Sequence, residues 1–348
     1  MTTALRLPRQ RTLVTGGAGF IGAEVVLSLL DDGSEVVILD DLSTVAPDWR
    51  DRLDSRSGWS LVIADVADET AVRAAIEGCG RVIHLAASTD IAGGVGHPER
   101  DFETCVVGTQ VVCSAMLQAG MRDLWFASSG VIYGASNGRP LAEGDGPYRP
   151  ASHYAADKLA GEAIISGFAH LYGWRAIAFR FGNTVGARSD HGVVHDFVVK
   201  LLRDPTSLEV LGSGRQAKPY IDVGDLVRGM RHAASVVDAP FTPLNVGPPG
   251  TVSVDDIATI VIEALGLDAS TVDRRHRQVS DDGGGWPGDT PLVAFDMSSM
   301  ARLGWTPAMD AGDAIRHAAS AIADRYRGGD RALLTAVERR AAKPVGVA

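Results

Sequence analysis

A glycine-spaced turn near the N-terminus constrains the fold of this chain more than any other segment. Gly16, Gly19 and Gly22 follow the apolar run 12–14 and precede the amphipathic run 23–30. This order predicts a strand, a tight turn and a helix. One glycine would allow the sharp turn, one would let a diphosphate approach the backbone, and one would let the helix pack close to the strand. The helix would direct free N–H groups at the phosphates. We therefore predict a dinucleotide-binding turn, and a purely structural glycine-rich turn is the alternative.

The first half of the chain alternates short apolar runs with helical stretches. This alternation predicts an α/β fold, a Rossmann-type doubly wound parallel sheet with helices on both faces. We expect a dinucleotide-binding domain over residues 1–180. The expected strands are 12–14, 35–39, 60–63, 82–85, 124–127 and 176–179, and the expected helices are 21–32, 67–77, 98–119 and 152–172.

The pattern loosens after about residue 180, which predicts a smaller C-terminal α/β substrate-binding lobe over 181–328, partly interleaved with the first domain. Residues 281–291 are rich in glycine and proline and are expected to form a loop over a site, and 329–348 a mobile tail. The expected helices are 193–203, 222–237, 252–265 and 310–326, and the expected strands are 208–211 and 244–246.

Composition narrows the class of protein. The formal net charge is −10, whereas a nucleic-acid-binding protein would carry a basic face. The three cysteines form no CxxC pair and have no histidine at metal-ligand spacing, so we expect reduced thiols and no metal. The chain shows no signal peptide and no apolar run long enough for a membrane span. We therefore expect a soluble cytoplasmic protein without a membrane or nucleic-acid partner.

Two acidic residues follow predicted strands. Asp40 ends the second strand, where a carboxylate can accept hydrogen bonds from the adenosine ribose and would repel a 2′-phosphate. This favours NAD over NADP, and a helix N-cap is the alternative for Asp40. Asp65 and Val66 follow the third strand and could hold the adenine edge, although an N-cap at Asp65 fits the spacing nearly as well.

A tyrosine and a lysine four residues apart provide the candidate chemistry. Tyr154 and Lys158 fall on one helical face, and an ammonium beside a phenol is expected to lower the phenol pKa toward neutrality. Tyr154 could then act as a base or an acid. Ser129 ends the strand 124–127 and would place a hydroxyl at the ligand-binding edge of the sheet. The alternatives are an exposed Tyr/Lys pair and a capping serine.

Together these residues make the chain resemble the extended short-chain dehydrogenase/reductase family, specifically its NAD-dependent nucleotide-sugar epimerases of the UDP-glucose 4-epimerase type. The matching segments include TGGAGFIG at 15–22, LDDLST at 39–44, HLAAS at 84–88, SSGVIYG at 128–134, YAADK at 154–158 and RFGNTVGAR at 180–188. The resemblance implies a catalytic set of Ser129, Tyr154 and Lys158 and tightly held NAD.

The resemblance also implies the binding residues and a homodimer through a four-helix bundle of 98–119 and 152–172. Besides Tyr154 and Lys158, the implied cofactor-binding residues are Gly16, Gly19, Phe20, Ile21, Gly22, Asp40, Ser43, Asp65, Val66, Leu85, Ala86 and Ala87. The implied substrate-binding residues are Thr89, Ser129, Asn183, Gln216 and Lys218.

The implied reaction is epimerisation at C4 of a UDP-hexose or UDP-hexuronate through a transient 4-keto sugar. Val131 stands where the dehydratases and decarboxylases of the family carry a glutamate, which disfavours those reactions. Cys105 replaces a usual asparagine, and Trp286 stands where many UDP-sugar epimerases carry an arginine. The basic run 274–277 could supply that charge or could form a solvated strand. A 4-keto reductase and a non-catalytic NAD or nucleotide-sugar sensor remain alternatives.

Overall fold

A seven-stranded parallel sheet forms the centre of the computed structural model, which describes residues 8–46, 48–88, 96–136, 138–281, 283–286 and 288–329. The strand order is β11-β6-β5-β4-β1-β2-β3, and every neighbouring pair is parallel. These strands are β1 (Thr12–Thr15), β2 (Val36–Asp40), β3 (Trp59–Ile63), β4 (Arg81–His84), β5 (Asp123–Ser129), β6 (Arg175–Phe181) and β11 (Phe241–Val246).

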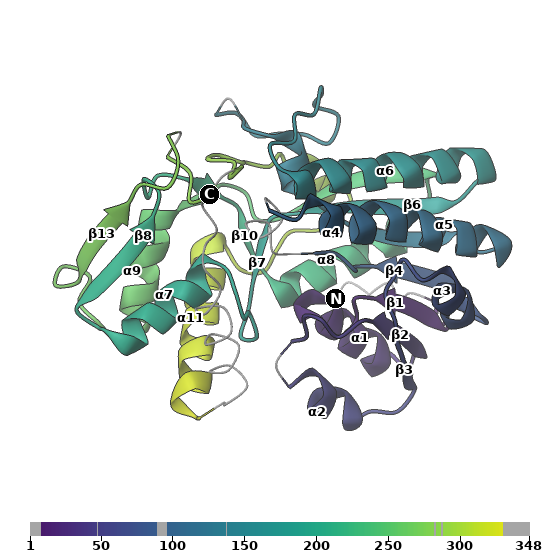
Figure 1. Cartoon of the computed structure of the whole chain (residues 1–348), viewed down its shortest axis with the longest axis horizontal. Coiled ribbons are helices and arrows are strands. Elements are labelled where there is room, and N and C mark those ends of the chain that lie inside the picture. Colours follow the sequence, from purple (N-terminus) through teal and green to yellow (C-terminus); the bar gives the residue numbers. More distant parts are fainter. Residues whose placement is uncertain are drawn as a thin grey trace.

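Helices cover both faces of this sheet (Figure 1), as the near-continuous apolar character of its strands requires. On one face α1 packs on α8 and against the strands, around Val26, Leu29 and Met230. On the other face α3, α5 and α6 enclose a second core around Val112, Met116 and Ile165. The helices are α1 (Phe20–Asp31), α3 (Glu69–Ile76), α5 (Gly108–Gln118), α6 (His153–Tyr172) and α8 (Val223–Val236), with the short α2 (Trp49–Asp54) and α10 (Ser298–Arg302) beside them.

This architecture confirms the predicted doubly wound α/β fold. The strand order changes direction at β1, which lies between β2 and β4. Ligands bind at the carboxyl ends of the strands beside such a switch point. The fold therefore places the turn after β1, and the residues that end β4 and β5, around one ligand-binding edge.

The long helix expected over 98–119 is interrupted. α4 (Pro98–Phe102) passes through a π-helical turn, Glu103–Val107, before α5 begins at Gly108. Single π-turns inside helices often occur at functional sites. This one contains Cys105, which is fully buried.

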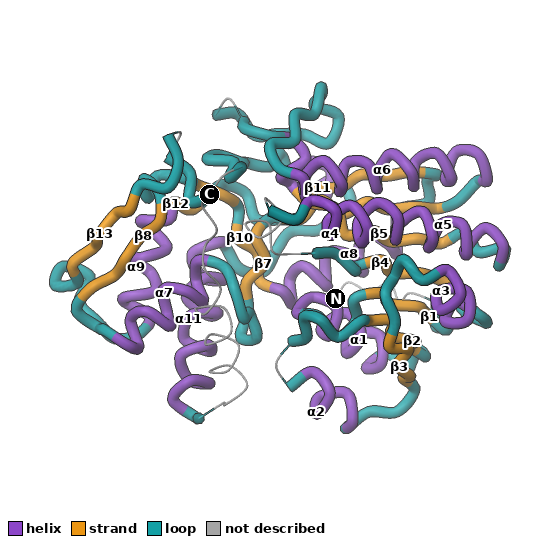
Figure 2. Tube along the Cα trace, viewed as in Figure 1, coloured by secondary structure: helices purple, strands orange, loops and turns teal. Residues whose placement is uncertain are grey.

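The remaining elements form what we call the C-terminal lobe, in which α7, α9 and α11 pack on one another around Phe197, Ile257 and Ile315 (Figure 2). Its strands form three pairs, β7 with β10, β8 with β13 and β9 with β12. The elements are β7 (Asn183–Val185), α7 (Val193–Arg203), β8 (Ser207–Leu211), β9 (Ala217–Lys218), β10 (Tyr220–Asp222), β12 (Val252–Ser253), α9 (Val254–Ala264), β13 (Asp273–Arg277) and α11 (Ala311–Arg327).

The chain crosses between the two regions more than once, because α8 and β11 return to the large sheet between elements of the C-terminal lobe. The basic run 274–277 lies in β13, which pairs with β8. It thus forms a strand, as the second of the two alternatives for this run predicts. Residues 283–286 and 288–291 contain no helix or regular strand. The expected tail lies outside the described residues from 330 onward.

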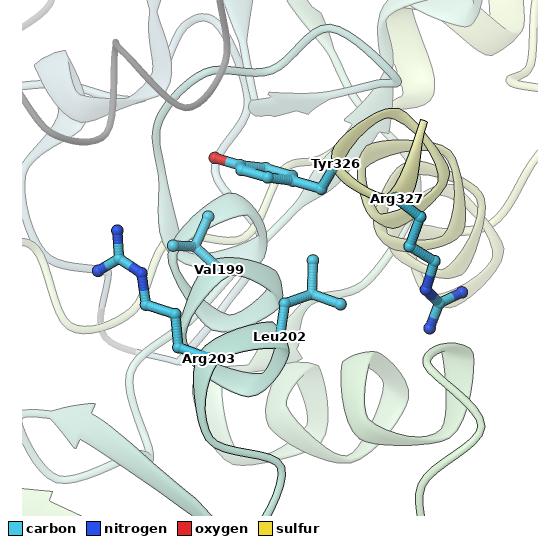
Figure 3. A pocket seen from close by; sticks show the side chains of 5 residues that line it. All are labelled: Val199, Leu202, Arg203, Tyr326 and Arg327. Carbon is cyan, nitrogen blue, oxygen red and sulfur yellow. The ribbon is translucent and has the colours of Figure 1, made fainter. Parts of the chain in front are cut away.

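A surface pocket of about 290 Å³ lies between α7 and α11 of the C-terminal lobe. Figure 3 shows Val199 and the Tyr326 ring across it, with the Arg203 and Arg327 side chains directed away from its centre. Its lining residues come from these two helices, whereas the predicted catalytic residues lie on β5 and α6. Among the residues that the structure describes, no helix has the length and apolar character needed to cross a membrane.

Candidate active site

The glycine turn after β1 brings the start of α1 against the end of β4. Gly16 has φ +68°, and a Cβ there would lie 2.8 Å from the Ala86 backbone nitrogen. A Cβ at Gly22 would lie 2.0 Å from the Gly16 carbonyl oxygen. Gly19 caps α1 without a side-chain hydrogen bond, so no side chain of the described residues occupies the first-turn N–H groups of Phe20 and Ile21. The turn is therefore built for a close backbone approach by a phosphate group.

Asp40 ends β2 and joins two loops. Its buried carboxylate accepts hydrogen bonds from the Ala18 N–H and the Leu42 N–H, each at 2.9 Å. Burial raises the pKa of Asp40, and the two backbone hydrogen bonds oppose that rise. The next helix, α2, begins at Trp49, so Asp40 is not its N-cap. Each carboxylate oxygen keeps a lone pair for a ribose hydroxyl.

The residues expected around adenine follow β3. Asp65 is exposed and accepts from the Ala67 N–H at 2.8 Å, whereas Asp68 is the N-cap of α3. The N-cap alternative for Asp65 is therefore wrong. The Val66 side chain packs in the core, where a Cβ at Gly108 would lie 2.5 Å from it, so only its backbone could face a ligand.

Other predicted cofactor residues lie at neighbouring strand ends. The exposed Ser43 donates its hydroxyl to Asp41 at 2.7 Å. Leu85 and Ala86 donate their N–H groups to the Thr15 hydroxyl at 3.2 and 3.3 Å, and Ala87 follows them, partly exposed. These bonds tie the start of the glycine turn to the end of β4.

A buried histidine continues this connection. His84 Nδ1 lies 2.7 Å from the Thr15 hydroxyl, and its Nε2 lies 3.0 Å from the Thr109 hydroxyl. Thr109 donates to the Cys105 carbonyl at 2.6 Å, so the chain of hydrogen bonds links the glycine turn to the π-turn. Burial, and then the charge of Lys158, lowers the pKa of His84 to about 3. The imidazole is neutral at physiological pH.

The predicted catalytic residues converge where β5 meets α6. The Ser129 side chain lies beside the Tyr154 hydroxyl, close enough to lower the pKa of the phenol. The Lys158 ammonium donates to the Ala127 carbonyl at 2.8 Å and lies 5.8 Å from the centroid of the Tyr154 ring. Lys158 is fully buried, and burial lowers its pKa. The sequence spacing therefore did bring a hydroxyl, a phenol and an ammonium together.

The expected effect on the phenol is reversed. Burial raises the pKa of Tyr154, electrostatic interaction with the acidic groups of Cys105 and Asp101 raises it further, and the neighbouring Ser129 side chain lowers it. The prediction that Lys158 lowers the pKa of Tyr154 toward neutrality was therefore wrong.

Two further buried groups surround the tyrosine. Asp101 of α4 is 1% exposed, and neither of its carboxylate oxygens has a hydrogen-bond partner among the described residues. Burial raises the pKa of the Cys105 thiol, whereas the Lys158 charge and a hydrogen bond with the Ser88 backbone lower it. Cys105 is thus a neutral group on the wall of the site, in place of an amide.

The predicted substrate residues occupy different environments. Asn183, on β7, is exposed, and its side chain lies near enough to the Tyr220 hydroxyl to lower the pKa of that phenol. Gln216 is buried and donates its amide to the Leu211 carbonyl at 2.8 Å, so it supports its own turn. Thr89 lies outside the described residues.

Lys218 is already paired. It forms a buried ion pair with Asp289 and lies 4.9 Å from the centroid of the Trp286 ring. Asp289 also accepts from the Gly285 N–H at 3.0 Å, so the pair fastens the glycine-rich loop to β9. The sequence singled out Lys218 and Trp286 but not Asp289, which lies 71 residues from its partner.

Sequence reasoning also missed Glu162 and Arg180. Glu162 lies one turn beyond Lys158 on α6 and accepts from Arg180 of β6 at 2.7 Å. Both side chains are almost fully buried. The i, i+4, i+8 spacing of Tyr154, Lys158 and Glu162 was the available signal.

These residues fit an NAD molecule. The uncapped start of α1 and the closely packed glycines would receive the diphosphate, and Asp40 would accept from the adenosine ribose. Among the described residues there is no cluster of three or more histidine, cysteine or acidic side chains arranged for a metal ion.

Comparison with known proteins agrees with this geometry. A UDP-glucose 4-epimerase of Mycolicibacterium smegmatis is 35% identical over 262 residues, which span 74% of this chain and 83% of that protein. The crystal structure of a UDP-galactose 4-epimerase has a TM-score of 0.79 at 36% identity, covering 90% of this chain and 99% of that one. The Thermus thermophilus UDP-glucose 4-epimerase in complex with NAD has a TM-score of 0.79 at 30% identity, covering 92% and 99%.

The family profile that matches the chain extends over residues 12–247, from β1 through β11. It therefore includes the glycine turn, Asp40 and the Ser129, Tyr154 and Lys158 cluster. The chain belongs to the NAD dependent epimerase/dehydratase family, within the extended short-chain dehydrogenases/reductases.

Proposed function

We propose that this protein is an NAD-dependent epimerase that inverts C4 of a UDP-hexose or UDP-hexuronate. The observation that carries the proposal is the convergence of Ser129, Tyr154 and Lys158 beside the glycine turn. NAD, when bound, supplies a hydride acceptor and donor. Because C4 is oxidised and then reduced on its other face, net redox is zero and the cofactor is regenerated.

In this proposal Tyr154 takes the proton of the sugar 4-hydroxyl and later returns it. The neighbouring Ser129 hydroxyl favours the phenolate and would itself lie beside the sugar oxygen. Burial works against ionisation, so the positive charge of bound NAD and of Lys158 must help to stabilise the phenolate. Lys158, held by the Ala127 carbonyl, would also bind the nicotinamide ribose.

The C-terminal lobe would bind the nucleotide diphosphate. Asn183 is exposed and available to a ligand. Because Lys218 is neutralised by Asp289, we infer that it contributes little free positive charge to a diphosphate. Trp286, stacked on that ammonium, offers an apolar face in place of an arginine.

The test uses the protein as purified, with no added NAD or NADH. We expect it to interconvert UDP-glucose and UDP-galactose, or the corresponding UDP-hexuronates, and Tyr154→Phe to lower kcat by about 10²–10⁴-fold. A 4-keto reductase would instead consume NADH with each product molecule. A sensor would bind nucleotide sugar without turnover, and Tyr154→Phe would then change nothing.

We also propose a homodimer formed through α5 and α6, which lie side by side in Figures 1 and 2. Leu117 at the end of α5, and Leu171 and Tyr172 at the end of α6, are 37%, 78% and 43% exposed. A contact between two such faces would bury these apolar side chains. Leu171→Asp should shift the mass measured by light scattering toward the monomer, and an unchanged mass would exclude α6 from the interface.

The free cysteines support a reducing, cytoplasmic location.

A further inference from the structure

Three residues of α6 lie against three consecutive residues at the end of β5. Tyr154, Lys158 and Glu162 occupy one stripe of the helix, at i, i+4 and i+8. Tyr154 lies beside Ser129, Lys158 donates to the Ala127 carbonyl at 2.8 Å, and Glu162 accepts from the Ser128 hydroxyl at 2.5 Å. The first two contacts involve residues proposed for catalysis, and the third does not.

The Glu162 carboxylate is itself fixed from the other side. Arg180 of β6 donates Nε at 2.9 Å and Nη2 at 2.7 Å to its two oxygens. This is the two-pronged geometry that orients a carboxylate most firmly. Arg180 also donates to the Tyr133 hydroxyl at 2.9 Å and the Tyr148 hydroxyl at 3.1 Å, so the guanidinium cannot turn away.

The backbone needs such support at this point. Ser129 is the last residue of β5 paired with β6, and the chain turns into a 3-10 helix at Gly130. Within its own turn, the Ser129 hydroxyl accepts only a long bond, 3.4 Å from the Val131 N–H. The adjacent Ser128 is 2% exposed and holds the short bond to Glu162.

We propose that Glu162, held by Arg180, is a positioning residue that fixes Ser128 and thereby keeps Ser129 beside the Tyr154 hydroxyl. The inference rests on the proposed function, because it assumes that Ser129 and Tyr154 act on the sugar. Reaction rates respond steeply to the placement of reacting groups, and a shift of about 1 Å can cost about 10²-fold. Glu162 acts through Ser128 and touches neither sugar nor cofactor in this account.

Ser128→Ala in the NAD-loaded enzyme is the most selective test, since it removes the tie and leaves the Glu162–Arg180 ion pair intact. We expect kcat for the UDP-hexose to fall by about tenfold to 10²-fold, with KM within about twofold and NAD content unchanged. Ser166→Ala is the matched control, because its hydroxyl lies near His170 on the same helix and away from β5. The control should keep the wild-type kcat.

Glu162→Gln keeps an acceptor for Ser128 but loses the charge that orients Arg180, so kcat should fall in this variant too. If Ser128→Ala keeps the wild-type kcat, or loses activity only in proportion to the loss of folded, NAD-loaded protein, the positioning role is refuted. A wild-type protein that turns over no UDP-sugar would refute the proposed function itself, which is a separate result.

Discussion

Gly22→Ala tests whether the glycine turn is as closely packed as the structure indicates. The new Cβ would lie 2.0 Å from the Gly16 carbonyl oxygen and 2.8 Å from the Gly17 Cα. Both neighbours are backbone atoms of the turn itself, so no side-chain rotation can relieve the contact. Either the start of α1 must move away from β1, or the turn must open.

The magnitude follows from two opposing effects. Overpacking a tight site costs about 1–3 kcal/mol, whereas alanine is favoured over glycine inside a helix by about 0.5–1 kcal/mol. Because the obstacle is backbone, we place the overpacking cost at the upper end and expect a net loss of about 2 kcal/mol. With an unfolding entropy of about 2.1 cal/mol/K per residue over 348 residues, each kcal/mol corresponds to about 1.4 °C, so the melting temperature should fall by about 3 °C.

The assay combines thermal unfolding with the amount of NAD retained after gel filtration. Gly22→Ala should lose both stability and NAD, because the displaced N–H groups of α1 would no longer face the diphosphate. Gly312→Ala in α11 is the control, since the nearest atom that its Cβ would meet in the described part of the chain is Asp310 Oδ1, at 3.4 Å. A Gly22→Ala protein with wild-type melting temperature and stoichiometric NAD would refute this account of the turn.

Three further predictions concern buried polar groups. Folding holds the pKa of His84 at about 3, so below pH 6.5 the unfolded chain binds a proton at this imidazole that the folded chain does not bind. The free energy of unfolding should therefore fall by about 2 kcal/mol between pH 6.5 and 5. His84→Gln should remove this pH dependence, as measured by urea unfolding. Asp40→Asn can satisfy only one of its two backbone donors, so NAD should dissociate at least about tenfold faster, and an unchanged rate would exclude a ribose contact. Asp289→Asn leaves the Lys218 charge buried and should cost about 3–5 kcal/mol in urea unfolding, whereas a loss below about 1 kcal/mol would show that the pair is solvated.

The large sheet could be predicted from the sequence because its strands are buried on both faces and read as apolar runs. The apolar run 36–39 and the glycines at 16–22 predicted the first β–α–β unit. The remaining strands of the sheet were predicted from the same alternation of apolar runs and helical stretches. The strands β7, β9, β10 and β12 escaped prediction because each has only two or three residues, too few to display a period.

The candidate site was predictable only where its residues are close in the chain. The spacing of Tyr154 and Lys158 is local, but the Glu162–Arg180 pair and the Lys218–Asp289 pair join residues 18 and 71 positions apart. The direction of the Tyr154 pKa was wrong for the same reason, since it depends on burial and on Asp101 and Cys105, which are brought there by packing.

The central claim, inversion at C4 through internal return of hydride, is tested most directly by turnover of UDP-galactose in deuterated water, followed by NMR. We expect UDP-glucose that carries protium at every ring carbon, formed without consumption of NADH. Deuterium at C3 or C5 would show enolisation instead. Stoichiometric loss of NADH would show a net reduction, and either result would contradict the proposed mechanism.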